Sequence, residues 1–297
     1  MIMASDSRTP PEGNIHRSGV FLMFIGIVCL GMPNAASAEP QFQYSCLFEE
    51  TLAELYKKAI FDPNATVNWR AHEQNGLSKD SFTTEDGGMI HGLVWRAPNP
   101  QGYVIVVQGT SMLAAELYND LPDFRSIGLD VYLYDYRGYG ASNKLTTTLE
   151  GMISDYRKRI SELNELPGYS FHFGYGISMG GIVILNAVLD LAEPLHGLVF
   201  DSVPHAIPWY AFCPNRLNPV RILPEKCTIW LIIAAERDRV IGRRAAKFAK
   251  RATASCGAEQ QIKRKYGHVY MDRNFDERAN AAVQHFASLM AQATIED

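Results

Sequence analysis

The sequence has little that would suit it to bind nucleic acid or a metal ion. Its 28 lysines and arginines are fewer than its 32 aspartates and glutamates, and the formal net charge is −4. This balance gives no reason to expect nucleic acid as a partner. There are only 5 cysteines, without Cys-x-x-Cys spacing or a Cys/His cluster, which disfavours zinc. We therefore expect no nucleic acid, no metal and no cofactor.

The chain also lacks internal repeats, and beyond its N-terminal region it lacks long apolar runs. The one such run, residues 19–31, follows Arg17 and precedes an Ala-Ser-Ala stretch at residues 36–38. A basic segment, a short apolar segment and small residues are typical of a secretory signal peptide. We predict that residues 1–38 are this signal and that cleavage follows Ala38, so that the protein is periplasmic or secreted. An uncleaved anchor is the alternative.

Export to an oxidising compartment would allow disulfides. The four cysteines after the signal permit three pairings, and they are Cys46, Cys213, Cys227 and Cys256. Because Cys213 and Cys227 bracket a proline-rich loop, we predict a bridge between them, with Cys46 and Cys256 as the remaining pair. Four buried free thiols are the alternative.

The part of the chain after residue 38 divides into two regions. Residues 39–80 are predicted to be a helical extension, since Leu52, Leu55 and Ala59 recur at helical spacing. Residues 81–297 are predicted to be one domain in which strands and helices alternate. Strands are expected at 89–97, 102–109, 129–134, 170–176, 195–202, 228–235 and 260–266, and helices at 114–127, 149–163, 179–192, 243–254 and 276–290.

Nearly all of the predicted strands are apolar, which indicates burial on both faces of a sheet. Such strands in alternation with helices predict an α/β fold with a mostly parallel central sheet flanked by helices. In these sheets, ligand chemistry gathers at the carboxyl ends of the strands. The residues that follow each strand are therefore the first candidates for function.

Ser178 follows a predicted strand and precedes an apolar helix, in the pattern Gly176-x-Ser178-x-Gly180. A serine at such a turn is typical of a nucleophile elbow. The glycines remove Cβ atoms that would clash where helix and strand approach closely. The helix N-terminus offers the N–H of Met179 to a developing oxyanion, and Thr110, after an earlier strand, offers a second.

A nucleophilic serine needs a base, and the base needs an orienting carboxylate. In a fold of this type the chain order is serine, acid, histidine. His268 follows the last predicted strand and is the predicted base. Asp238, just after the strand at 228–235, is the predicted acid, and Asp201, at the end of the preceding strand, is the alternative.

Together these residues resemble the alpha/beta-hydrolase superfamily, in particular a branch with a small lid. The resemblance covers residues 81–289 and depends on YDYRGYGAS at 134–142, GYGISMGG at 174–181, an aspartate after a strand and the Gly-His pair before Val269. It implies the alpha/beta-hydrolase fold. It also implies that Ser178, Asp238 and His268 take the nucleophile, acid and base positions, with Thr110 and Met179 at the oxyanion positions.

Residues 203–227 lie where that superfamily inserts a lid, which here is short. Its aromatic side chains are expected to form an apolar wall for an acyl group or to pack the lid onto the domain, and they are Trp209, Tyr210 and Phe212. The cations of residues 243–251 would face solvent or touch an anionic membrane peripherally, and solvent is the expected surrounding.

The sequence thus predicts an exported serine hydrolase that cleaves a small-molecule carboxylic ester or thioester through an acyl-enzyme. An acyltransferase or a peptidase or amidase with the same triad, and a binding module without catalysis, are the alternatives.

Overall fold

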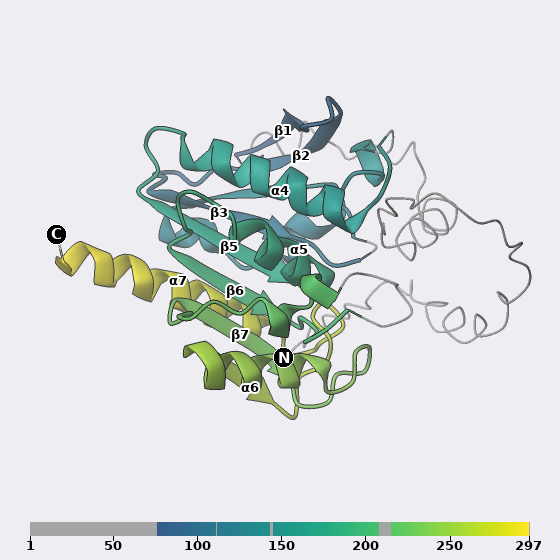
Figure 1. The fold of residues 1–297 in the computed structure, drawn as a ribbon. Coiled ribbons are helices and arrows are strands. Elements are labelled where there is room, and N and C mark those ends of the chain that lie inside the picture. Colours follow the sequence, from purple (N-terminus) through teal and green to yellow (C-terminus); the bar gives the residue numbers. More distant parts are fainter. Residues whose placement is uncertain (1–75, 111, 143–144, 208–214, 297) are drawn as a thin grey trace, which may run out of the picture. The chain divides into compact units, whose positions relative to one another are not determined.

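An eight-stranded sheet forms the centre of the fold (Figure 1). The computed structural model describes residues 76–110, 112–142, 145–207 and 215–296. The strands are β1 (Leu77–Thr83), β2 (Met89–Trp95), β3 (Gly102–Val107), β4 (Leu129–Tyr134), β5 (Phe171–Ile177), β6 (Gly197–Asp201), β7 (Trp230–Ala235) and β8 (Glu259–Lys263).

The order across the sheet is β1-β2-β4-β3-β5-β6-β7-β8. β2 pairs antiparallel with β1 and β4, and every other pair is parallel. Because β3 and β5 are parallel neighbours in the middle of the sheet, the loops that follow them meet at the carboxyl ends of the strands. β6, β7 and β8 continue the sheet in parallel, so the segments that carry the predicted acid and base begin at the same end.

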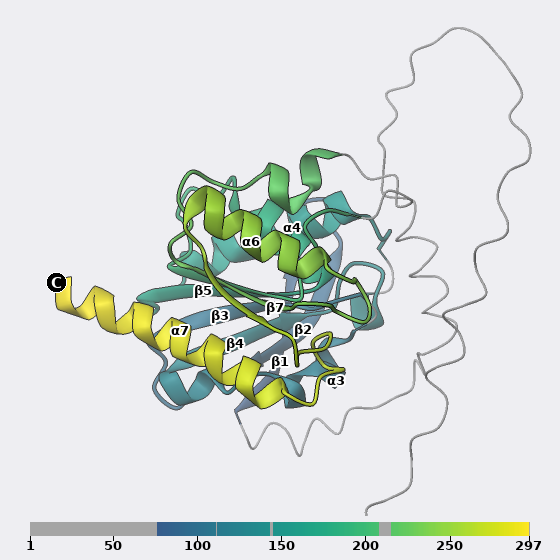
Figure 2. The same ribbon diagram turned by 90° about the horizontal axis from the view of Figure 1, so that it is seen from below.

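Helices cover both faces of the sheet (Figure 2). One face carries α4 (Leu149–Asn164), α5 (Met179–Val188) and α6 (Arg244–Cys256), and the other carries α3 (Ala114–Leu117) and α7 (Phe275–Glu296). Short 3-10 turns complete the description, namely η1 (Tyr118–Asp120), η2 (Phe124–Ile127), η3 (Gly140–Ser142), η5 (Asn215–Leu217) and η6 (Pro219–Arg221).

The core has two parts, one on each face of the sheet. Along β3, Tyr103, Ile105 and Val107 belong to the cluster shared with α4 and α5, whereas Val104 and Val106 belong to the cluster shared with α7. All six residues of β3 are buried. A strand that is covered twice must be apolar at every position, which explains its continuous apolar sequence.

The predicted mostly parallel sheet with helices on both faces is confirmed. One local expectation was wrong, and one strand was not predicted. Residues 77–83 form β1, which buries only Leu77 and Phe82 and has a polar sequence. The helix predicted for 114–127 breaks into α3, η1 and η2, because Pro122 lacks an N–H and disfavours helical backbone before it.

The predicted signal at 1–38, its cleavage point and the helix expected after Cys46 lie outside the described residues. Within the part that the structure describes, no helix combines the length and apolar character that crossing a membrane requires.

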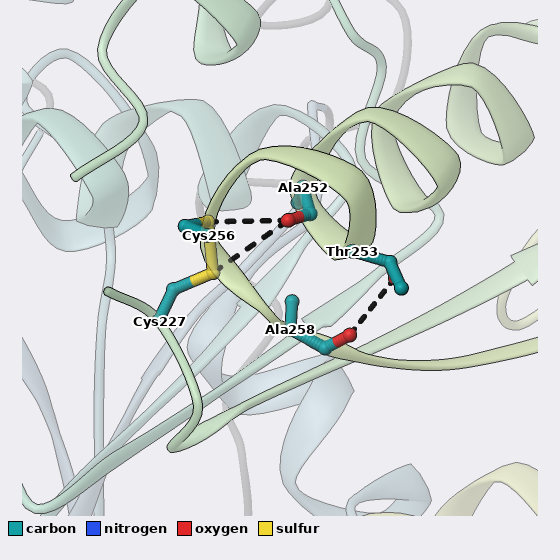
Figure 3. Close-up of a disulfide and its surroundings, with 5 residues drawn as sticks. All are labelled: Cys227, Ala252, Thr253, Cys256 and Ala258. Carbon is teal, nitrogen blue, oxygen red and sulfur yellow. Dashed lines mark hydrogen bonds between the residues drawn. A yellow bond between two sulfur atoms is a disulfide. The ribbon is translucent and has the colours of Figure 1, made fainter. Parts of the chain in front are cut away.

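The structure contradicts the predicted cysteine pairing, because Cys227 is bonded to Cys256 rather than to Cys213 (Figure 3). Their Cα atoms are 5.1 Å apart. Cys227 precedes β7 and Cys256 ends α6, and a helix that returns across its strand brings those two ends together. The prediction relied on closeness in sequence, whereas the crossover determines closeness in space. Cys46 and Cys213 lie outside the described residues.

Replacing Cys227 and Cys256 with alanine is expected to lower the free energy of unfolding by about 3 to 4 kcal/mol. The bridge closes a loop across a sequence separation of 29 residues, and removing it frees the unfolded chain. Urea denaturation measures the difference. A reducing agent should destabilise the wild type by a similar amount and leave the double variant unchanged. If the reducing agent left the free energy of unfolding of the wild type unchanged, the bridge would contribute nothing to stability.

Candidate active site

Ser178 lies at the turn between β5 and α5 in a strained backbone conformation. Its φ is 50° and its ψ is −115°. Left-handed backbone costs a non-glycine residue on the order of 1–3 kcal/mol and is concentrated at functional sites. The turn is held because the Ser178 N–H donates to the carbonyl oxygen of Asp201 at 2.8 Å. The side chain is partly exposed, as a nucleophile must be.

The glycines around Ser178 permit contacts that no larger residue would allow. A Cβ on Gly176 would lie 2.7 Å from the Cα of Gly181, at the start of α5. A Cβ on Gly180 would overlap the carbonyl oxygen of Val107, at the end of β3. Backbone atoms cannot move aside as flexible side chains can. The glycines therefore let α5 start directly against β3 and β5, as the elbow requires.

Asp238 and His268, the predicted acid and base, are in contact. The Nδ1 of His268 is 2.7 Å from the Oδ2 of Asp238. The second carboxylate oxygen, Oδ1, accepts the N–H groups of Val240 at 2.7 Å and Ile241 at 3.0 Å. The Asp238 side chain is fully buried and that of His268 is 12% exposed. The carboxylate is thus fixed in the protein while the ring reaches toward the surface.

These contacts determine the protonation of the pair. Burial of Asp238 opposes its ionisation, but the hydrogen bond and charge of His268 and the two backbone N–H groups outweigh it and lower the pKa of the carboxyl group. An ionised carboxylate only accepts hydrogen bonds. Nδ1 of His268 is therefore the donor in this hydrogen bond, and in the neutral ring form that a general base requires, the lone pair lies on Nε2.

Asp201, the alternative acid, has a different partner. Its carboxylate is fully buried and forms an ion pair with Arg278 on α7. Tyr175 also donates to it at 3.3 Å. In the structure His268 therefore contacts Asp238, whereas Asp201 is paired with Arg278.

The two predicted oxyanion residues lie next to each other. The hydroxyl of Thr110 is 3.4 Å from the sulfur of Met179. A Cβ placed on Gly109 would lie 3.5 Å from the Cβ of Ser178, so the loop after β3 runs beside the serine. Backbone N–H groups from this loop and from the start of α5 are therefore near the group that would attack a carbonyl.

The YDYRGYGAS segment holds that loop through hydrogen bonds. The sequence alone did not reveal this role of the segment. Gln108 is fully buried, and its amide donates to the carbonyl of Tyr134 at 2.6 Å. The hydroxyl of Tyr136 donates in return to the carbonyl of Gln108 at 2.5 Å. Asp135 accepts the N–H of Ala114, the first residue of α3, at 2.9 Å. The motif therefore fixes both ends of the segment that carries Thr110.

The predicted lid is described only in part. Trp209, Tyr210 and Phe212 lie outside the described residues. On either side of that gap, the N–H of Ile207 donates to the side-chain oxygen of Asn218 at 2.8 Å, and η5 and η6 are short turns. Nothing in the described ranges groups three or more metal-ligating side chains.

A profile of the family described as serine aminopeptidase, S33, matches residues 98–223. The match spans β3 to η6 and includes Ser178, but it ends before Asp238 and His268. Solved structures with the same fold add the remaining strands. The chain has the alpha/beta-hydrolase fold. Among curated proteins, none matches its sequence.

Three solved structures illustrate the similarity. An esterase of Pyrococcus furiosus aligns with a TM-score of 0.61 and 20% identity, over 75% of this chain and 95% of its own. A thermostable carboxyl esterase of Bacillus coagulans aligns at 0.56 and 12%, over 72% and 99%. An alpha/beta hydrolase of Penicillium aligns at 0.57 and 16%, over 72% and 99%. At such identities the likeness establishes the fold of this chain.

Proposed function

We propose that the protein is an exported serine hydrolase that cleaves a carboxylic ester or thioester bond of a small acyl substrate. The observation that carries the proposal is the 2.7 Å contact between His268 and a buried, ionised Asp238. This contact would orient the ring so that Nε2 can serve as general base toward Ser178, which is held at a strained elbow. The fold shared with two esterases supports an ester substrate.

The proposed reaction begins when Nε2 of His268 accepts the proton of Ser178 and the serine Oγ bonds to the substrate carbonyl carbon. The carbonyl oxygen becomes an oxyanion, which the N–H groups of Met179 and Thr110 stabilise. As the C–O or C–S bond breaks, the leaving alcohol or thiol takes the proton from His268. Water then loses a proton to His268 and attacks the acyl-enzyme, which releases a carboxylic acid and restores Ser178.

Nitrophenyl esters of increasing acyl length test this proposal, each beside an amide of the same acyl group and with or without an added alcohol. We expect hydrolysis of the esters, with the preferred length giving the size of the pocket that Trp209, Tyr210 and Phe212 are predicted to line. Faster cleavage of the amides would favour a peptidase, the activity named in the matched family description. Transfer to the alcohol would favour an acyltransferase. A folded protein with no turnover would favour a binding module.

Export is a separate part of the proposal. Sequencing the N-terminus of protein recovered from outside the cytoplasm should find Glu39 first. Recovery of a chain that retains residues 1–38 would favour the uncleaved anchor. Peripheral membrane contact through α6 stays a prediction, and the helix buries four of its alanines and Phe248 in the core.

Gly180→Ala is expected to lower kcat by about 10²-fold, because the new methyl group would displace the elbow and a misplacement of about 1 Å costs that much. Gly168→Ala is the control: Gly168 is exposed, has a φ of 93° and has open space around its Cβ position. That change should cost about 1 kcal/mol of stability and leave kcat unchanged. Ester hydrolysis and thermal unfolding are measured together, and a fully active Gly180→Ala would contradict the close contact with β3.

A further inference from the structure

Arg278 on α7 is fully buried, and each of its five N–H groups has an acceptor. Nε donates to Oδ2 of Asp201 at 3.1 Å. Nη1 donates to the carbonyl of Gly267 at 2.8 Å and to Oδ2 of Asp272 at 2.9 Å. Nη2 donates to Oδ1 of Asp201 and to the hydroxyl of Ser202 at 2.7 Å. The two carboxylates also raise the pKa of Arg278 against the effect of burial, so the charge is permanent.

Several of these contacts hold the loop that carries His268. Gly267 precedes the histidine, and Asp272 follows it by four residues. A third contact is indirect: the N–H of Val269 donates to the hydroxyl of Ser202 at 3.2 Å, and that hydroxyl also accepts from Arg278. The loop is thus attached to Arg278 on both sides of His268.

The same network reaches the nucleophile through Asp201. The carboxylate of Asp201 binds Arg278, while its backbone carbonyl accepts the N–H of Ser178 at 2.8 Å. Ser202, the next residue, has a φ of 57°, a strained conformation in which its hydroxyl bonds both Arg278 and the histidine loop. A continuous set of hydrogen bonds therefore connects the backbone of Ser178 to the loop of His268.

We propose that the Asp201–Arg278 pair is the positioning device that sets His268 relative to Ser178. The inference rests on the proposed function of Ser178 as nucleophile and His268 as base. Neither Asp201 nor Arg278 touches the substrate or the reacting atoms in the mechanism above. Both act through the backbone segments that carry the nucleophile and the base.

The geometry explains why the residue is arginine. A lysine at position 278 keeps the charge but has three donors for five acceptors, so at least two buried oxygen atoms lose a hydrogen bond. The loop would have to shift or admit water. A displacement of about 1 Å at the base is enough to reduce kcat by about 10²-fold. The affinity for substrate should change little, because the contacts with the substrate are elsewhere.

Arg278→Lys, Asp201→Asn and Ser202→Ala test the inference, with Arg159→Lys and Asp80→Asn as controls. Arg159 and Asp80 form a half-buried ion pair at 2.6 Å between α4 and β1, at the opposite edge of the sheet. For each variant we would measure kcat and KM for the preferred ester, the melting temperature, and hydrogen exchange of residues 266–272.

The expected result for Arg278→Lys is a loss of kcat of about 10²-fold at nearly constant KM. Faster exchange of residues 266–272 should accompany it, and Arg278→Met should be worse than Arg278→Lys. The controls should lower the melting temperature and keep kcat. A folded Arg278→Lys whose kcat equals that of Arg159→Lys would overturn the inference. If that variant does not fold, Asp201→Asn and Ser202→Ala decide in the same way.

The activity of the wild type distinguishes failure of this inference from failure of the proposed function. A wild type that cleaves neither ester nor amide contradicts the function and, with it, a catalytic purpose for the network. The exchange measurement then still decides whether Arg278 holds the loop. An active wild type with fully active Arg278, Asp201 and Ser202 variants contradicts the inference alone.

Discussion

Ser178→Ala is expected to reduce kcat for the preferred ester by about 10⁶-fold, the loss that follows removal of a triad serine in subtilisin. The change removes the atom that bonds to the acyl group, so hydrolysis can proceed only through direct attack of water. The fold should survive, because the strained backbone of residue 178 is held by the hydrogen bond from its N–H to Asp201 and not by its side chain.

Ser170→Ala is a suitable control, since Ser170 is exposed and precedes β5 at the other end of the strand. Steady-state rates with the same ester measure both variants. Equal rates for Ser178→Ala and Ser170→Ala would remove Ser178 from the reaction.

Asp238→Asn is expected to reduce kcat by about 10⁴-fold, as in a serine protease whose histidine takes the wrong tautomer. The structure gives the reason. Two backbone N–H groups, from Val240 and Ile241, point at Oδ1, so an asparagine must keep its oxygen there. Its NH₂ group then faces Nδ1 of His268. That nitrogen becomes an acceptor, and the proton moves to Nε2, which can no longer accept the proton of Ser178.

Asp130→Asn is the matched control, because Asp130 is 1% exposed and also accepts a backbone N–H, that of Ala97 at 2.6 Å. It lies at the start of β4, at the end of the sheet away from the candidate site. It should lower stability and leave kcat unchanged. A drop for Asp130→Asn as large as that for Asp238→Asn would mean that both act only through stability.

The sequence predicted the fold and the residues at the strand ends for a common physical reason. Buried parallel strands are apolar throughout, so β3, β5 and β7 are visible as short apolar runs. Ser178 and Asp238 follow two of those runs at once. The chain order of the triad then left His268 as the base. β1 was not predicted because it is largely exposed and its sequence is polar.

Features that depend on packing between distant segments were not visible in the same way. The Cys227–Cys256 bridge follows from the crossover of β7 and α6. The role of Arg278 follows from the burial of α7. A signal was present, however: Phe275, Arg278 and Ala282 recur at helical spacing, which places the arginine on the apolar face of its helix. A cation on such a face must have buried partners, here Asp201 and Asp272.

Labelling with a fluorophosphonate, followed by mapping of the modified peptide, tests the central claim most directly. The reagent modifies a serine only when a base activates it, and it needs no knowledge of the natural substrate. One adduct is expected, on Ser178 of the wild type, that is absent from Ser178→Ala and forms much more slowly on Asp238→Asn. A folded wild type that resists the reagent, or an adduct on another serine, would contradict it.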